Sequence, residues 1–256
     1  MPTTTVDTFY KFAPLVIAHR GASYAAPENT LAAFSLAREM GADGVELDTS
    51  LTLDGIPVVI HNFTLEHTTD GTGRVTSLDL SEIKALDAGN HFSPKFKGEQ
   101  IPTLDEVFET VGPQMVVNVE LKSASVRSNG LEPAVASVIQ RHNAAQRVIV
   151  SSFNPFALRR FRTAAPDIPL GYLTSSEEPR YLRNGWLLAR FRVEAQHPED
   201  SMVDSGYMAR SKRLGQRVNV WTVDNPIRMR QLQLLGVDAL ITNRPDVALQ
   251  TLRQQK

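Results

Sequence analysis

Residues 15–48 read LVIAHRGASYAAPENTLAAFSLAREMGADGVELD, and this stretch shows the pattern that the rest of the chain repeats. The apolar run Leu15–His19 predicts a buried strand. Asn29–Met40 predicts a helix that ends near Gly41, and Gly44–Asp48 predicts a second strand. A strand, a helix and another strand in this order indicate an α/β chain with a parallel sheet.

The same alternation continues through the chain. Further strands are predicted at Met115–Leu121, Arg147–Ser151, Ile168–Leu173, Phe191–Gln196, Arg217–Trp221 and Asp238–Thr242. Helices are predicted at Leu104–Val111, Leu131–His142, Pro155–Ala165, Pro179–Arg190, Val203–Leu214, Pro226–Leu235 and Pro245–Gln254. Eight such units predict a TIM (β/α)8 barrel, with residues 1–256 as a single domain. A doubly wound open sheet is the alternative, but no Gly-x-Gly-x-x-Gly follows the first strand.

One interval is too long for an ordinary barrel loop. About fifty residues separate the second strand from the helix at Leu104–Val111. Leu51–Leu53 and Pro57–Ile60 flank Asp54-Gly55, a pair that favours a tight hairpin turn, so this hairpin would bring His61 back roughly opposite Asp48. We expect the inserted segment, about residues 51–102, to cap the barrel mouth.

Composition excludes several classes of protein. The chain has 256 residues, of which 42% are hydrophobic and 21% charged, as in an ordinary globular protein. Its net charge of −1 argues against nucleic-acid binding. It has no cysteine, which removes disulfides and thiolate chemistry and is compatible with a reducing compartment. Without a signal-like N-terminus or a long apolar run, we expect a soluble, cytoplasmic protein with no stable membrane association; the oligomeric state stays open.

Polar residues gather where the predicted strands end, and in a parallel barrel these ends converge on one mouth. Glu46 and Asp48 are two residues apart, so on a strand they face the same way, and Glu120 and Lys122 repeat that spacing. Three carboxylates in one small cavity should raise each other's pKa unless a cation lies between them. Oxygen ligands favour a hard ion, Mg²⁺ or Ca²⁺.

Each residue also has a structural interpretation when taken singly. One glutamate at the end of a barrel strand is as compatible with hydrogen bonding as with metal binding. The same balance holds for His19, His61 and Trp221. For the other histidines we expect structural roles; these are His67, His91, His142 and His197.

An ordered set of motifs resembles the glycerophosphodiester phosphodiesterase family. The motifs are His19-Arg20-Gly21, Pro27-Glu28-Asn29-Thr30, Glu46-x-Asp48, Val58-Val59-Ile60-His61, Glu120-Leu121-Lys122, Val220-Trp221-Thr222-Val223-Asp224-Asn225, Gly236-Val237-Asp238 and Ile241-Thr242-Asn243-Arg244-Pro245. The likeness spans nearly the whole chain. It implies that Glu46, Asp48 and Glu120 bind a divalent cation and that His19 and His61 form an acid/base pair. It also assigns four residues to the substrate, with Arg20 and Lys122 on the phosphate and Glu28 and Trp221 beside them.

Two positions depart from the family pattern. Asn62 stands where an Asp usually follows the second histidine, and His67 stands where an Arg usually precedes the Thr-Thr pair. Because Asn has no charge to stabilise an imidazolium, we expect a lower pKa for His61.

The expected reaction is the metal-dependent hydrolysis of a glycerophosphodiester to glycerol 3-phosphate and an alcohol. The cation, Arg20 and Lys122 would neutralise the phosphate, while His19 acts as base and His61 as acid. The C2 hydroxyl of glycerol would be the nucleophile, giving a cyclic phosphate that water then opens. Alternatives are a phosphatidylinositol-type phospholipase C, a lysophospholipase D and a non-catalytic binding module. The sequence shows no sign of the apolar rim that a lipid substrate would require, and it leaves the head group and the choice between Mg²⁺ and Ca²⁺ open.

Overall fold

The computed structural model describes residues 8–10, 14–183 and 191–253. Its strands are β1 (Leu15–His19), β2 (Gly44–Leu51), β3 (Pro57–Val59), β4 (Val116–Leu121), β5 (Val148–Ser152), β6 (Leu170–Thr174), β7 (Ala195–Pro198), β8 (Arg217–Val220) and β9 (Ala239–Thr242). Its α-helices are α2 (Leu31–Glu39), α3 (Leu80–Lys84), α4 (Leu104–Val111), α5 (Leu131–Arg141), α6 (Pro155–Ala164), α7 (Arg180–Arg183), α8 (Ser205–Arg213), α9 (Pro226–Leu235) and α10 (Pro245–Arg253). Short 3₁₀ turns include η1 (Val75–Ser77) and η2 (Pro94–Phe96).

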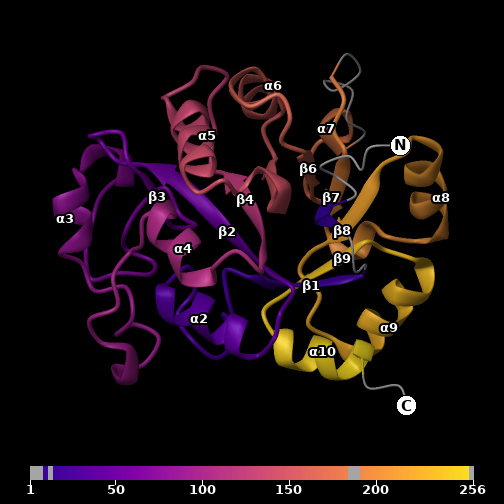
Figure 1. Cartoon of the computed structure of the whole chain (residues 1–256), viewed down its shortest axis with the longest axis horizontal. Helices are drawn as coiled ribbons and strands as arrows, with labels where there is room; N and C mark the ends of the chain where they lie inside the picture. The colour runs from indigo at the N-terminus through magenta and orange to yellow at the C-terminus, as the bar shows by residue number, and fades with distance from the viewer. Residues whose placement is uncertain (1–7, 11–13, 184–190, 254–256) are drawn as a thin grey trace.

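The parallel strands close into a barrel. They follow one another in the order β1, β2, β4, β5, β6, β7, β8 and β9, and β1 pairs with both β2 and β9. Ile17 shows the closure, because its register partners are Gly44 on one side and Ile241 on the other. Helices surround these strands in Figure 1. The predicted TIM barrel is confirmed.

Several predicted boundaries shift. Strand β7 begins at Ala195 rather than Phe191, because pairing with β6 starts at Gly171↔Ala195. Helix α8 begins at Ser205 rather than Val203, because the Asp204 carboxylate accepts a hydrogen bond from the Tyr207 N–H and caps the helix there. Of the helix predicted over 179–190, α7 is its described part, and 184–190 lie outside the described residues.

Alternation along the strands divides the core from the site. Val45 and Leu47 on β2 are fully buried and belong to the cluster that packs against the outer helices, together with Leu104 and Phe108 of α4. Neighbouring residues on a strand face opposite sides, so Glu46 and Asp48, which alternate with Val45 and Leu47, point into the barrel. The same apolar packing that fixes β2 therefore aims its two acidic residues inward.

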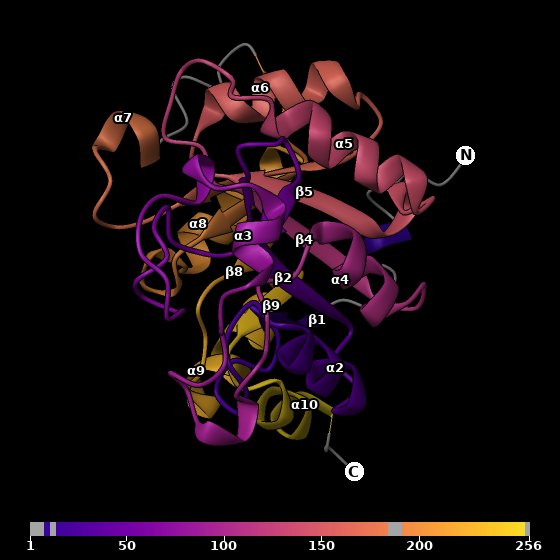
Figure 2. The same cartoon turned by 90° about the vertical axis from the view of Figure 1, so that its left-hand side faces the viewer.

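The insertion begins as a hairpin on the barrel itself. Strand β3 pairs antiparallel with the end of β2, with Thr49 opposite Val59, and Gly55 takes the positive φ of 83° that the turn requires. The Ile60 N–H donates to the carbonyl of Asp48, so His61 lies one residue beyond the predicted position. A small apolar core of its own, which includes Leu65, holds the insertion together. It lies to the left in Figure 1 and faces the viewer in Figure 2, where α3 is in front.

No helix in the described part of the chain has both the length and the apolar character required to cross a bilayer.

Candidate active site

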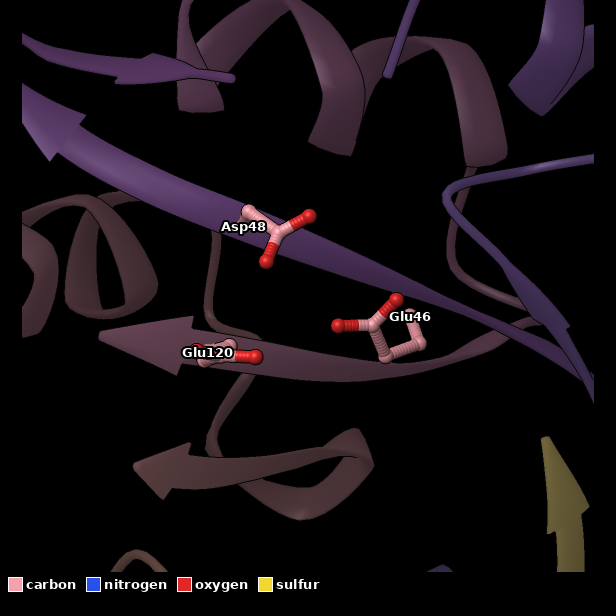
Figure 3. A group of neighbouring side chains, drawn as sticks. All are labelled: Glu46, Asp48 and Glu120. Atoms are coloured by element: carbon pink, nitrogen blue, oxygen red, sulfur yellow. The ribbon is translucent and has the colours of Figure 1, made fainter. Parts of the chain in front are cut away.

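Three buried carboxylates converge inside the barrel. Glu46 and Asp48 come from β2 and Glu120 from the neighbouring β4, where its Cα is the register partner of Asp48. One oxygen from each residue lies within 4.8 Å of one from each of the others. Figure 3 shows the three carboxyl groups side by side on the two strands. This is the group that the two-residue spacing predicted.

Two cations lie against these carboxylates. Arg20 Nε is 3.1 Å from Asp48 Oδ2, and Lys122 Nζ is 3.1 Å from Glu120 Oε1 and 3.6 Å from Asp48 Oδ1. Burial disfavours the charged form of Lys122, but Glu120 and Asp48 raise its pKa above the usual value. Both side chains therefore stay cationic and face the carboxylates.

The three carboxyl groups do not share one pKa shift. Burial, followed by the charges of neighbouring carboxylates, raises the pKa of Glu46 well above its usual value and that of Glu120 to about 7. Burial also opposes ionisation of Asp48, but Arg20, Lys122 and other polar neighbours lower its pKa to about 2. The pKa values of Glu46 and Glu120 rise as expected for clustered carboxylates, whereas the pKa of Asp48 falls because both cationic side chains lie against it.

A tight turn after β1 places Arg20. Gly21 has a φ of 81°, and a Cβ there would lie 2.6 Å from the backbone of Ala33, so the turn excludes larger residues. Arg20 itself has a φ of 55°. Its Nη1 donates to both carboxylate oxygens of Glu28 at 3.0 Å. Glu28 thus contacts Arg20, and its predicted role at the substrate stays a prediction.

Both predicted histidines lie beside this group. His19 ends β1, and its Nε2 is 3.9 Å from Glu46 Oε2. Burial and the charge of Arg20 lower the pKa of His19 to about 4. The pKa of His61 is lowered first by burial, while the negative charge of Asp48 works in the opposite direction. Both imidazole rings are therefore favoured in the neutral form.

The two departures from the family pattern have different surroundings. Asn62 Oδ1 is 2.6 Å from His61 Nδ1, and this contact raises rather than lowers the pKa of His61. Burial is the main cause of the lowered pKa of His61, and the effect of Asn62 relative to an Asp stays a prediction. His67 is exposed in the insertion.

Trp221 and two of the remaining histidines have structural contacts. Trp221 Nε1 donates to the carbonyl of His197 at 2.7 Å, and its ring packs edge-on against Phe153. His197 is fully buried in the barrel. His142 Nε2 is 2.9 Å from Asp105 Oδ1. A substrate contact by Trp221 therefore stays a prediction.

The sequence did not assign roles to two asparagines of the site. Asn29 is buried, with a φ of 57°, and its Nδ2 donates to Asp48 Oδ2 at 2.9 Å. Asn243 Oδ1 is 2.7 Å from His19 Nδ1. Both lie in motifs quoted above, yet only the folded chain shows what each one contacts.

The chain has clear counterparts among known proteins. The model of the "Glycerophosphoryl diester phosphodiesterase family" matches residues 19–247, which include every residue of the site described above. The chain belongs to this family. The predicted family and enzyme class, a phosphoric diester hydrolase, are confirmed.

Individual members of the glycerophosphoryl diester phosphodiesterase family match almost end to end. A glycerophosphodiester phosphodiesterase of Caldanaerobacter subterraneus subsp. tengcongensis is 43% identical over 244 residues, which cover 94% of this chain and 98% of the relative. A phosphodiesterase structure from Oleispira antarctica, in complex with the product sn-glycerol-3-phosphate, has a TM-score of 0.83 and 34% identity over 95% of this chain and 98% of that one. A glycerophosphodiester phosphodiesterase structure from Agrobacterium tumefaciens has a TM-score of 0.78 and 30% identity over 91% and 98% of the two chains.

Proposed function

We propose that the protein hydrolyses glycerophosphodiesters to glycerol 3-phosphate and an alcohol, with a divalent cation held by Glu46, Asp48 and Glu120. The observation that carries this proposal is the convergence of three carboxylates, two cationic side chains and two histidines inside one end of the barrel. Family membership supports the same reaction class. The product named in the Oleispira antarctica structure suggests glycerol 3-phosphate as the common product.

The donor set fits a hard divalent ion. Glu28, Glu46, Asp48 and Glu120 carry two more charges than Arg20 and Lys122 can neutralise. Burial first, and then the neighbouring carboxylates, raise the pKa values of Glu46 and Glu120, so a bound divalent ion would favour their ionised forms. Carboxylate oxygens alone favour Mg²⁺ or Ca²⁺. When bound, such an ion would supply positive charge for the nonbridging oxygens of the phosphate.

The two histidines divide the proton transfers. His19 takes the proton of the glycerol C2 hydroxyl as its oxygen attacks phosphorus, and His61 gives a proton to the departing alcohol oxygen. The second step returns both protons: His61 accepts one from water, and His19 protonates O2 as the cyclic phosphate opens. Burial lowers the pKa of His61, and Asp48 opposes this shift, so the assignment of His61 as the acid rests on the proposed reaction.

A panel of diesters assayed before and after chelation tests the proposal. Glycerophosphocholine should release glycerol 3-phosphate, exhaustive EDTA should abolish the release, and Mg²⁺ or Ca²⁺ should restore it. Calorimetry should show that the Glu120→Gln variant binds the same ion more weakly. A diester without the C2 hydroxyl should bind as a competitive inhibitor and resist cleavage, since intramolecular attack has a high effective molarity. Full activity after chelation would contradict the metal requirement.

A lysophospholipid is a second candidate substrate, and the absence of an apolar rim stays a prediction. Five exposed large apolar side chains lie in or next to the loops that follow barrel or hairpin strands: Tyr24, Phe63, Val126, Phe156 and Ile227. The loops that follow parallel barrel strands share the mouth of the barrel. Lysophosphatidylcholine therefore belongs in the same panel. A higher kcat/KM than for glycerophosphocholine would favour this lipid as the substrate.

A further inference from the structure

The closing seam of the barrel contains a chain of three side chains that ends at His19. Asn243 follows β9 directly, and its Oδ1 is 2.7 Å from His19 Nδ1 at the end of the adjacent β1. Asn243 Nδ2 donates at 2.7 Å to Asp224 Oδ2, in the loop after β8. Three neighbouring strand ends thus supply one connected set of hydrogen bonds.

The Asp224 carboxylate has little freedom to rotate. Its Oδ1 accepts from the backbone N–H of Asn243 and from the hydroxyl of Thr242, both at 2.9 Å. Its Oδ2 is therefore the oxygen that faces the Asn243 side chain. An ionised carboxylate accepts hydrogen bonds and cannot donate them.

This acceptor decides which way the Asn243 amide points. If the amide were turned over, its oxygen would face Asp224 Oδ2 as a second acceptor, and that contact would be repulsive. The nitrogen therefore points to Asp224 and the oxygen to His19. The Ser23 hydroxyl also donates to this oxygen, at 2.9 Å.

The orientation of Asn243 in turn fixes the proton of His19. A neutral imidazole has one N–H, and only a protonated Nδ1 can donate to an amide oxygen. We propose that Asp224, acting through Asn243, holds His19 in the tautomer with the proton on Nδ1, so that Nε2 keeps its electron pair for the substrate hydroxyl. Nε2 is the ring nitrogen nearer to the carboxylates, 3.9 Å from Glu46. Asp224 and Asn243 are thus positioning residues, and their role rests on the proposed function of His19 as base.

The Asp224→Asn variant tests this arrangement with almost no change in shape. The introduced amide keeps its oxygen on the backbone N–H of Asn243 and on the Thr242 hydroxyl, so its NH₂ group must face the Asn243 side chain. Asn243 then turns its own oxygen toward that NH₂ group and its nitrogen toward His19. His19 must accept at Nδ1 and carry its proton on Nε2, which removes the electron pair that the base requires.

Exchanging the two residues should reverse the effect. In the D224N/N243D double variant, the amide now at position 224 donates to the carboxylate now at position 243, and this carboxylate accepts from His19 Nδ1. The proton returns to Nδ1. A residue with only a structural role would give no reason for the second substitution to rescue the first.

Two measurements follow the variants. Two-bond ¹H–¹⁵N spectra report which nitrogen of His19 is protonated, with the signal assigned by comparison with His19→Gln. We expect Nδ1–H in the wild type and in the double variant, and Nε2–H in Asp224→Asn. For Asp224→Asn, kcat should fall by about tenfold to a hundredfold with little change in KM, and the double variant should recover most of it. Asp204→Asn, which keeps a good helix cap, is the matched control and should change neither readout.

The two readouts separate this inference from the proposed function. If His19 keeps its proton on Nδ1 in folded Asp224→Asn, the inference is wrong. If the proton moves to Nε2 while kcat is unchanged, the positioning holds but His19 is not the base. Circular dichroism checks the folding of both variants, and the single substitution should leave the spectrum unchanged.

Discussion

The two histidines of the site have the same kind of partner on the same ring atom. His19 Nδ1 contacts Asn243 Oδ1 at 2.7 Å, and His61 Nδ1 contacts Asn62 Oδ1 at 2.6 Å. Each contact leaves Nε2 as the nitrogen available for proton transfer. An asparagine oxygen orients an imidazole without adding a charge, so both rings can change protonation state more readily than beside a carboxylate.

His19→Ala and His61→Ala should each lower kcat by about a hundredfold or more, the usual scale for a general acid or base. KM should change little, because the proposed phosphate contacts of Arg20 and Lys122 would be kept. Steady-state kinetics would measure both. His142→Ala is the matched control: His142 lies at the end of α5 and pairs with Asp105, so its loss should leave kcat unchanged. Near wild-type turnover in either site variant would make that histidine structural.

Glu120→Gln should change the stability of the metal-free protein in a pH-dependent way. Burial raises the pKa of Glu120 in the folded protein to about 7, above its usual 4.5. Such a group contributes stability below pH 4.5, and the contribution is lost as pH rises through 7. Between these values the metal-free wild type should lose stability relative to Glu120→Gln, measured by urea unfolding.

Added Mg²⁺ or Ca²⁺ should make the wild type more stable than Glu120→Gln, because only the wild type has the full set of three carboxylates to bind the ion. A pH-independent difference between the metal-free proteins would show that the pKa of Glu120 is the same in the folded and unfolded states.

Residue spacing predicted part of this site. Glu46, Asp48 and Glu120 could be found because period-two alternation on a strand fixes which side chains share a face. Asn243 could not be found in this way, because its contact with His19 spans 224 positions and depends on closure of the barrel. The low pKa of Asp48 was also missed, since it depends on where two long cationic side chains lie.

At the level of elements, the sheet interior contains a polar contact that depends on one glycine. His197 of β7 is fully buried, and its Nε2 is 2.9 Å from Asn219 Nδ2 on β8. On the other side lies Gly171 of β6, where a Cβ would be 2.3 Å from that same nitrogen. Glycine at this position makes room for the ring. Burial lowers the pKa of His197 to about 3.

This buried histidine should make the barrel sensitive to acid. The unfolded chain binds a proton at His197 near pH 6.5, and the folded chain resists it until about pH 3. Stability is therefore fully present above pH 6.5 and falls as pH decreases through this window, by at most about 1.4 kcal/mol per pH unit for one proton. Urea unfolding at about pH 7.5, 5.5 and 4.5 would measure the slope. His197→Gln, which cannot be protonated, should have a shallower slope than the wild type, and equal slopes would contradict the prediction.

Element boundaries depended on contacts that sequence pattern does not contain. The hairpin at Asp54-Gly55 was predicted because its turn is encoded locally by two residues. Its first strand, however, is the end of β2, because the barrel strand continues to Leu51 before the chain turns back. The start of α8 was displaced because Asp204 caps the helix, and that choice between neighbouring positions is made by one side chain.

For the whole molecule, strand and helix alternation predicted a closed barrel because eight parallel strands have few other arrangements. The exposure of single large apolar side chains in loops was not predicted. A residue such as Val126 or Ile227 gives the same signal in a sequence whether it is buried or exposed, and only the packing of its loop decides. Whether an apolar loop side chain is exposed therefore depends on how the whole chain folds.

The seam between β1 and β9 has a consequence for biosynthesis. A ribosome releases the N-terminal part of a chain first, so the three carboxylates, His19 and His61 emerge long before Asn243. Until β9 pairs with β1, His19 has no partner at Nδ1 and the barrel remains open. Before Asn243 is in place, the His19 ring therefore lacks the contact that orients it. The contact between His19 and Asn243 can therefore form only after residue 243 has been translated.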